Sequence, residues 1–222
     1  MTGGVDDKVK DTRGLSGEPV LEAAWRLLEQ HGAAGVLLDL GCGQGRLRER
    51  LPAAVTKYVG VDLSQHGAAW LDGAGFVEAD LSAPLPLPDG FADVVASLET
   101  IEHLENPRAF LREAVRVLRP GGLLLVTTPN QESLLSLASL WVHGEHVAFR
   151  NAPGLYPSHV TALLGVDLLR MAAECGLEDA ALAYTGQGRM PGTARPWPAI
   201  LRGRRFSDNV LLVARRPSAP RP

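Results

Sequence analysis

Residues 36–45 read Val-Leu-Leu-Asp-Leu-Gly-Cys-Gly-Gln-Gly, an apolar run that ends in three alternating glycines. A short apolar run bounded by glycines is typical of a parallel strand that is buried on both faces. Glycine lets the backbone turn sharply after a strand, and it lets a ligand approach the backbone amides without a Cβ in the way. The stretch therefore predicts a ligand-binding turn at the carboxyl end of a buried strand.

Strands and helices alternate along the rest of the chain. Further strands are predicted at 57–61, 75–79, 91–97, 123–127, 180–185 and 209–214. Helices are predicted after Pro19, from the Asn106-Pro107 cap to a stop at Pro120-Gly121-Gly122, and over 168–175. Such alternation predicts an α/β fold with a doubly wound parallel sheet, whose ligand lies at the carboxyl ends of the strands.

The size and charge of the chain indicate one domain without a general affinity for polyanions. Its 222 residues suit a single α/β domain, expected over 18–217 after a mobile arm at 1–17. The formal charge of −3 gives no overall basic field for nucleic acid. Two cysteines, no secretion signal and no apolar run long enough to cross a bilayer predict a soluble cytoplasmic protein with no membrane span. The oligomeric state is left open.

Acidic residues follow the second and third predicted strands. Asp62 is placed to accept hydrogen bonds from the hydroxyls of a ribose, as a carboxylate does there in nucleotide-binding sheets. Asp80 is placed to hold an adenine amino group, with Leu63 and Leu81 on either side of the base. A dinucleotide fingerprint needs a glycine where Arg46 stands, so the G-x-G-x-G spacing weighs against NAD.

With these motifs the chain resembles the class I S-adenosylmethionine-dependent methyltransferases. The resemblance is carried by VLLDLGCGQG (36–45), YVGVDLS (58–64), FVEADL (76–81), FADVVASLETIEHLENP (91–107) and RVLRPGGLLLVTTPN (116–130). It implies a Rossmann-like, mostly parallel seven-stranded sheet with the last strand antiparallel, and S-adenosylmethionine as cofactor. One departure is the segment 64–73, which is shorter than the usual helix there.

The resemblance also implies roles for individual residues. Asp39, Gly41, Cys42, Gly43 and Gly45 would face the methionine part of the cofactor. Asp62 and Leu63 would face the ribose and one side of the base, Asp80 and Leu81 the adenine, and the backbone near Leu98 the methionine amino group.

Methyl transfer from a sulfonium is an in-line displacement, so positioning of the nucleophile and exclusion of water supply most of the acceleration. An oxygen acceptor also has to lose a proton, which directs attention to Glu99, Glu102 and His103 after the fourth predicted strand. His103 is the first candidate for a general base because imidazole titrates near neutral pH. These residues also suit the start of the next helix, where carboxylates complement the helix dipole.

No metal is expected in the leading interpretation, but an alternative places one here. Glu99, Glu102 and His103 with a later histidine, His146 or His159, offer the oxygen and nitrogen ligands of a divalent ion. This pattern resembles small-RNA 3′-terminal 2′-O-methyltransferases, and similar residues occur in quinone-biosynthesis O-methyltransferases.

Two connections are longer than usual loops. The segment 131–160 is rich in apolar residues and predicts a lid over the acceptor, with an extra core helix or a membrane-surface element as alternatives. The loop 186–208 is basic and suits a phosphate or carboxylate. Its arginines are Arg189, Arg195, Arg202, Arg204 and Arg205. With a negative overall charge, a small acidic or sugar-like acceptor is favoured over RNA.

The sequence thus predicts a methyltransferase that acts on a small molecule, at oxygen. Three alternatives stay open: a metal-assisted enzyme for RNA 3′ ends, a non-catalytic nucleotide-binding module and an NAD-dependent oxidoreductase.

Overall fold

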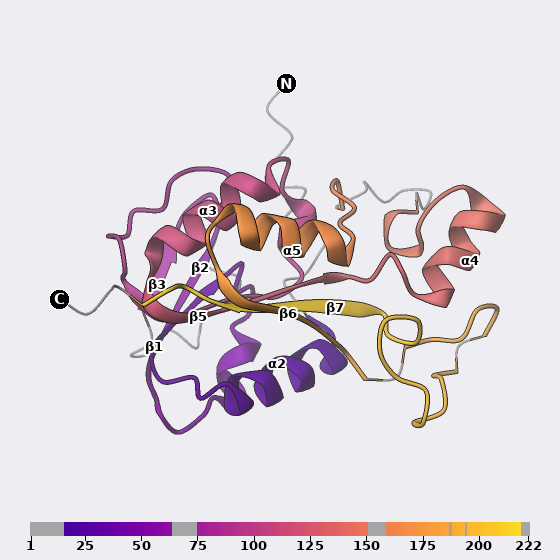
Figure 1. The fold of residues 1–222 in the computed structure, drawn as a ribbon, viewed down its shortest axis with the longest axis horizontal. Coiled ribbons are helices and arrows are strands. Elements are labelled where there is room, and N and C mark those ends of the chain that lie inside the picture. The colour runs from indigo at the N-terminus through magenta and orange to yellow at the C-terminus, as the bar shows by residue number, and fades with distance from the viewer. Residues whose placement is uncertain (1–15, 64–74, 151–158, 187, 194, 219–222) are drawn as a thin grey trace.

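A computed structural model describes residues 16–63, 75–150, 159–186, 188–193 and 195–218. Most of the predicted N-terminal arm, the short segment 64–73 and Tyr156 of the predicted lid lie outside these ranges. The described residues form a seven-stranded sheet with helices on both faces (Figure 1). The predicted doubly wound α/β fold is confirmed.

The strand order places the ends of β1 and β4 at the centre of the sheet. The strands are β1 (Gly35–Leu40), β2 (Val55–Asp62), β3 (Gly75–Glu78), β4 (Ala92–Ser97), β5 (Leu118–Pro129), β6 (Glu178–Tyr184) and β7 (Asn209–Arg215). They follow the order β3-β2-β1-β4-β5-β7-β6, and β7 runs antiparallel to both of its neighbours. The chain order reverses between β1 and β4, which is where open α/β sheets bind ligands.

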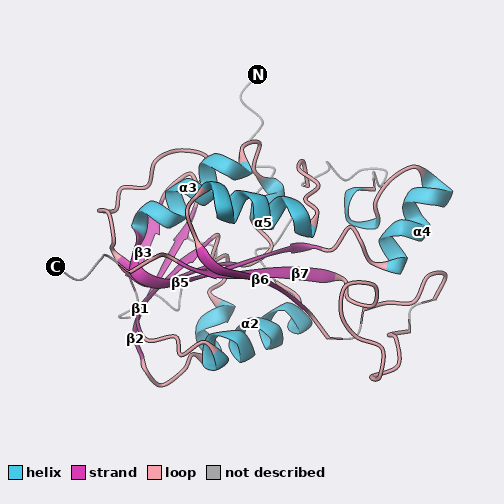
Figure 2. Cartoon of the chain, viewed as in Figure 1, coloured by secondary structure: helices cyan, strands magenta, loops and turns pink. Residues whose placement is uncertain are grey.

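The sheet has a separate apolar core on each face, because successive side chains of a strand point to opposite sides. Leu37, Leu123 and Leu125 pack with α2 (Glu18–Gln30) on one face. Leu38 and Leu124 pack on the other face, with the helices α3 (Pro107–Val117) and α5 (Gly165–Glu174). Figure 2 shows α2 below the sheet and α3 and α5 above it. The near-continuous apolar strands are therefore explained by burial on both sides.

The helix caps follow the sequence closely. In α3, the Asn106 side chain accepts a hydrogen bond from the Ala109 amide at 3.0 Å, and Pro107 occupies the first helical position. In α2, Pro19 lies in the first turn, and the apolar face of the helix is buried. These helices are confirmed where they were predicted.

A short 3-10 helix, η1 (Arg46–Arg50), follows the glycine turn. One predicted boundary is wrong. The helix expected to run to Pro120 ends at Val117, because Leu118 already pairs with Ala92 and so begins β5. Cross-strand pairing replaces the last helical turn there.

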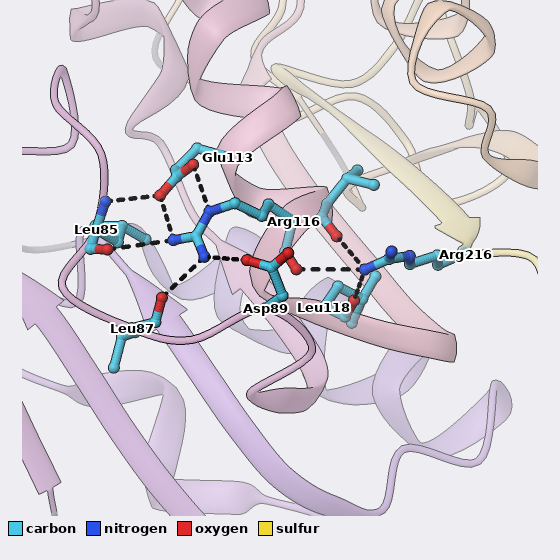
Figure 3. A network of polar contacts seen from close by, with 8 residues as sticks. Leu85, Leu87, Asp89, Glu113, Arg116, Leu118 and Arg216 are labelled. Carbon is cyan, nitrogen blue, oxygen red and sulfur yellow. Dashed lines mark hydrogen bonds and ion pairs between the residues drawn. The ribbon is translucent and has the colours of Figure 1, made fainter.

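A polar network secures the end of α3 (Figure 3). The Arg116 guanidinium bonds Glu113 and Asp89, each at 2.6 Å, and it also donates to the carbonyls of Leu85 and Leu87. Arg216, just after β7, donates to the carbonyls of Val115, Arg116 and Leu118. Carbonyls at the end of a helix lack partners within the helix, so these bonds help to satisfy them. The network lies where β5 begins, away from the strand ends that form the candidate site.

The segment after β5 projects from the sheet beside the loop that precedes β7 (Figure 1). It contains α4 (Leu134–His143) and the 3-10 helix η4 (Val147–Phe149). The buried positions of α4 are Ser136 and Ser139, whereas Trp141 is 89% exposed. The alternative of an extra core helix is therefore wrong, since a core helix would bury its apolar side chains.

Candidate cofactor and acceptor sites

The glycine turn has the backbone that its spacing predicts. Gly41, Gly43 and Gly45 have φ angles of 78°, 49° and 71°, in the left-handed region that favours glycine. A Cβ on Gly41 would overlap the side chain of Thr100. The carbonyl of Leu40 accepts hydrogen bonds from Ser97, at 2.8 Å, and from Thr100. The ends of β1 and β4 are thus held together under the turn.

Asp62 lies directly beside this turn. One carboxylate oxygen accepts from the Gly43 amide at 2.8 Å, and the other accepts from the Leu63 amide at 2.8 Å. Each oxygen keeps a second acceptor position. The structure therefore brings together the glycine turn and the acid that the sequence pairs with it, in a geometry that can accept two hydroxyl groups.

Asp39 has a different environment, because its carboxyl is buried below the turn. It accepts a hydrogen bond of 2.6 Å from the hydroxyl of Tyr58. Burial raises the pKa of Asp39 to about 7, the Tyr58 hydrogen bond opposes this shift, and the charge of Asp62 adds to it. Tyr58 was not singled out from the sequence, where it is one more aromatic residue of a strand. Its side chain nevertheless fixes the orientation of Asp39.

The remaining residues expected at the cofactor lie around the same strand ends. Asp80 is exposed and accepts from the Ser82 amide at 2.8 Å, which forms a local turn. Leu63 is 36% exposed, whereas Leu81 and Leu98 are 8% and 6% exposed. Cys42 is a buried free thiol, and burial raises its pKa above the usual range.

Glu99 follows β4 in an unusual backbone conformation, with a φ angle of 50°. Its amide donates to the Thr127 hydroxyl at 2.9 Å. Its carboxylate accepts from the Asn209 side chain at 2.9 Å and from the Gly17 amide at 3.3 Å. Backbone strain in a non-glycine residue persists only where the surroundings hold it in place. One segment therefore holds the backbone of Glu99, and two others hold its carboxylate.

Glu102, His103 and His159 form a cluster of potential metal ligands or proton acceptors. One ligand atom from each lies within 4.8 Å of those of the other two, and the two imidazole rings meet edge-on with centroids 4.7 Å apart. The amides of Val160 and Thr161 bond the Glu102 carbonyl at 2.9 and 3.0 Å, which brings His159 to this place.

Two members of this cluster, Glu102 and His159, have pKa values displaced from their ordinary ones. Glu102 is fully buried, and neither of its carboxylate oxygens makes a hydrogen bond of standard geometry to a described residue. Burial raises the pKa of Glu102 to about 8, and the charge of Glu99 adds to the shift. Burial lowers the pKa of His159, helped by the nearby charge of His103. His159 donates from Nδ1 to the Ala148 carbonyl at 2.7 Å, so Nε2 carries the lone pair of the neutral ring.

Two residues of the predicted metal alternative lie apart from this cluster. Glu99 is held by Gly17 and Asn209, as described above. His146 contacts the Ser136 hydroxyl through Nδ1 at 2.9 Å. Of the two later histidines, His159 is the one that joins Glu102 and His103.

A cavity of about 280 Å³ opens beside Glu99, at the ends of β4, β5 and β7. The first residues of α2 and the segment around η4 form the opposite walls, and His159 also lines the cavity. Its apolar lining is Pro19, Val20, Pro129, Val147 and Ala148, and its other polar lining is Asn130, Gln131, Ser133, Thr185, Arg189, Asp208 and Asn209. The residues of the glycine turn are not among those that line this cavity, so the cavity is distinct from the turn.

The arginines of the loop 186–208 are engaged mainly in internal contacts. Arg189 pairs with Asp208 at 2.8 Å, and Arg204 pairs with Glu132. Arg202 donates to the Ala199 carbonyl at 2.8 Å, and Arg205 to the Glu132 carbonyl at 3.1 Å. Most of the arginine side chains of this loop are therefore engaged in contacts that shape the loop.

Comparison with known proteins identifies the family. A family model described as "Methyltransferase domain" matches residues 38–126. A ubiquinone biosynthesis O-methyltransferase of Caulobacter vibrioides is 32% identical over 182 residues, which is 71% of each protein. The chain belongs to the S-adenosylmethionine-dependent methyltransferases. The cofactor expected from the glycine turn is thereby confirmed as S-adenosylmethionine, and NAD is excluded as the cofactor of this family.

Other relatives of this methyltransferase differ in length. A probable S-adenosylmethionine-dependent methyltransferase of Mycolicibacterium smegmatis is 30% identical over 189 residues, which is 81% of this chain and 67% of the relative. A similar protein of Mycobacterium tuberculosis is 34% identical over 114 residues, half of this chain but only 41% of the relative. The chain therefore spans between about two fifths and two thirds of these relatives.

Solved structures agree on the fold. A methyltransferase from Archaeoglobus fulgidus aligns with a TM-score of 0.63 over 88% of this chain and 94% of its own, at 18% identity. At that identity the likeness supports the architecture alone. No helix within the described residues is long and apolar enough to cross a bilayer.

Proposed function

We propose that this methyltransferase transfers the methyl group to an oxygen of a small molecule held in the cavity beside Glu99. The single observation that carries the proposal is the position of His159, which lines the cavity and whose Nδ1 bonds the Ala148 carbonyl, so that Nε2 is the acceptor nitrogen of the neutral ring. A cavity of about 280 Å³ is near the lower end of the range for small-molecule sites. Some relatives are O-methyltransferases, which is consistent with oxygen as the target.

The cofactor roles expected from the sequence fit the geometry. S-adenosylmethionine supplies an electrophilic methyl group on a sulfonium. Asp62 would accept hydrogen bonds from the ribose hydroxyls, because it lies beside the turn and each of its oxygens keeps acceptor capacity. Asp80 would bind the adenine amino group, and the opened backbone at Gly41, Gly43 and Gly45 would admit the methionine part.

Proton removal would fall to the pair of histidines. His159 faces the cavity, and its lowered pKa keeps the ring neutral and able to accept a proton at neutral pH. His103 meets the ring of His159 edge-on, with centroids 4.7 Å apart, and restricts the orientation of that ring. As the acceptor oxygen bonds to the methyl carbon and the sulfur–methyl bond breaks, the hydroxyl proton would pass to Nε2 of His159.

The test uses the purified protein with radiolabelled S-adenosylmethionine and fractions of a metabolite extract. We expect label in a small product whose methyl group is attached to oxygen, as determined by mass spectrometry and NMR. Label only on nitrogen, carbon or polymer would contradict the proposal. Formation of S-adenosylhomocysteine from the extract would exclude a non-catalytic module.

A second candidate is metal-assisted transfer, favoured by the cluster of Glu102, His103 and His159. The buried carboxylate of Glu102, which makes no hydrogen bond of standard geometry to a described residue, and Nε2 of His159 fit a divalent ion. Such an ion would supply a Lewis acid that orients adjacent hydroxyls of the acceptor and lowers the pKa of one of them. Loss of turnover after chelation, and its recovery with Mg²⁺ or Mn²⁺, would support this variant.

RNA as the acceptor has less support. The arginines available for phosphate contacts are largely paired within the loop, and the cavity is compact. Methylation of RNA would fall steeply with added salt, because phosphate contacts release counterions, whereas a small neutral acceptor would be nearly indifferent. A steep salt dependence would therefore favour the RNA alternative.

A further inference from the structure

The cavity beside Glu99 has an uneven charge. Asp208 lies next to its counterion Arg189, with 2.8 Å between the charged atoms, so this pair is close to neutral. Glu99, by contrast, takes part in no ion pair among the described residues, and its hydrogen-bond donors are an amide side chain and a backbone amide. The lining therefore contains one carboxylate without a cation of its own.

The position of this carboxylate is fixed from several sides. The strained backbone at Glu99 is held by Thr127 of β5, and the carboxylate by Asn209 of β7 and Gly17 before α2. The Asn209 bond, at 2.9 Å, is short, whereas the Gly17 bond, at 3.3 Å, is long. An oxygen with one long hydrogen bond retains capacity for a further donor. The ligand that satisfies it has to bring a hydrogen atom.

The two side-chain amides of the cavity lining after β5 are already engaged in hydrogen bonds within the protein. The Asn130 amide donates to the carbonyls of Arg204 and Ser207, and the Gln131 side chain bonds the Pro129 carbonyl and the Ser136 hydroxyl. Burial of an unmatched negative group beside Glu99 would be costly, because no free cation of the lining compensates for it.

We infer that Glu99 is the acceptor-recognition residue of this methyltransferase, and that it selects compact acceptors that present a hydrogen-bond donor, a hydroxyl or a protonated amine, over acceptors that present a carboxylate or phosphate. The inference rests on the proposed function and gives its acceptor a chemical class. It also reverses the expectation of an acidic acceptor that the arginine-rich loop suggested. Charge complementarity across such a site governs which ligands are admitted.

Three probes that share an aromatic ring with adjacent hydroxyls distinguish neutral, cationic and anionic acceptors. Catechol is neutral, dopamine is cationic and 3,4-dihydroxybenzoate is anionic. Their binding is measured by calorimetry on the protein saturated with S-adenosylhomocysteine, so that no turnover is needed. We expect dopamine and catechol to bind at least about tenfold more tightly than 3,4-dihydroxybenzoate. Tighter binding of dopamine than of catechol would identify the protonated amine as the group that Glu99 recognises. Equal binding of the two would identify the hydroxyl as that group.

The Glu99→Gln variant keeps the shape of the side chain and removes its charge. We expect the discrimination against 3,4-dihydroxybenzoate to shrink to within about threefold, while the affinity for S-adenosylhomocysteine stays unchanged. The matched control is Glu29→Gln, which removes the same charge from an exposed position near the far end of α2 and should keep the discrimination.

Three results would overturn the inference. They are binding of none of the probes, an unchanged order of affinities in Glu99→Gln, and a loss of S-adenosylhomocysteine affinity in that variant, which would assign Glu99 to the cofactor. Failure of the proposed function looks different: the probes would bind with the expected order, and no oxygen methylation would be found.

Discussion

The glycine turn and the acceptor cavity lie at the same edge of the sheet, yet their contacts span very different distances along the chain. The hydrogen bonds of the two acids at the turn join Gly43 to Asp62 and Tyr58 to Asp39, each 19 positions apart. Around the cavity, Glu99 bonds Gly17 at a separation of 82 and Asn209 at a separation of 110. The acids at the turn are positioned by contacts between β1 and β2, which are neighbours in the sequence. Glu99 at the cavity is positioned by segments that are distant in the sequence.

This difference corresponds to a difference in chemistry. In the proposed function, the turn would present backbone amides and acids to S-adenosylmethionine, the cofactor of the family. The cavity depends on the segments 131–160 and 186–208, which are additions to the central sheet, and loops of this kind carry the variable part of a function. Variants in each compartment show whether binding in one is energetically separate from binding in the other.

The largest effect is expected for Gly43→Val. A branched side chain at a φ angle of 49° strains the backbone, and it also fills the space that a ligand needs above the amide. We expect calorimetry to detect no binding of S-adenosylhomocysteine. The control is Gly176→Val, which has a similar φ angle of 69° but open space around it, between α5 and β6. If both variants lose binding equally, backbone strain rather than the turn is responsible.

Removal of His159 tests the other compartment. The His159→Ala variant should lower turnover by about 10²–10⁴-fold, the usual contribution of a general base, with little change in cofactor affinity. His103→Ala should have a smaller effect, because His103 reaches the cavity through the ring of His159. Equal turnover in His159→Ala and the parent protein would refute the proton-transfer role. A parallel loss of cofactor affinity would show that the compartments are coupled.

The cofactor compartment could be foreseen because its signals are local. A glycine pattern after an apolar run, and acids after the next two strands, place Asp62 and Asp80 at one edge once the sheet is known to be parallel. The sheet itself followed from alternating apolar strands and amphipathic helices. Tyr58 was missed, since nothing in the sequence distinguishes a strand tyrosine that bonds a buried acid from one that only packs.

The acceptor compartment could be foreseen only in part. Glu99, Glu102 and His103 were singled out because they follow β4, but their separation into two sites was not visible. That Glu99 would face Asn209 depends on β7 lying antiparallel beside β5. The choice of His159 over His146 depends on two backbone hydrogen bonds to the Glu102 carbonyl. The pairing of two arginines of the loop 186–208 with Asp208 and Glu132 was not visible in the sequence either.

A smaller effect, on stability rather than on catalysis, is expected for Glu102→Gln. The pKa of Glu102 in the folded protein, about 8, lies above its ordinary value of 4.5, so folding favours the protonated form. The free energy of unfolding of the parent protein should therefore decrease by up to about 4 kcal/mol as the pH rises from about 4.5 to 8. The variant should lack this component. Urea unfolding at pH 5 and pH 8.5 measures it, and an identical pH dependence in both proteins would show that Glu102 is ionised when folded.

The smallest effect is expected for Asp62→Ala, which keeps the turn but removes the acceptor of two amides and, in the proposal, of the ribose hydroxyls. The loss of charge-assisted hydrogen bonds should weaken S-adenosylhomocysteine binding by about 1–3 kcal/mol. Asp62→Asn retains one acceptor oxygen toward Gly43 and should lose less. Asp80→Ala gives an independent comparison, because Asp80 bonds only a local amide of its own turn among the contacts described. If Asp62→Ala binds S-adenosylhomocysteine as tightly as the parent protein in calorimetry, the ribose is held elsewhere.

The same variant also tests the separation of the two compartments. Asp62 contacts the turn and not the cavity, so Asp62→Ala should leave the binding of catechol to the protein saturated with S-adenosylhomocysteine unchanged. Weaker binding of catechol would show that the compartments are not separate.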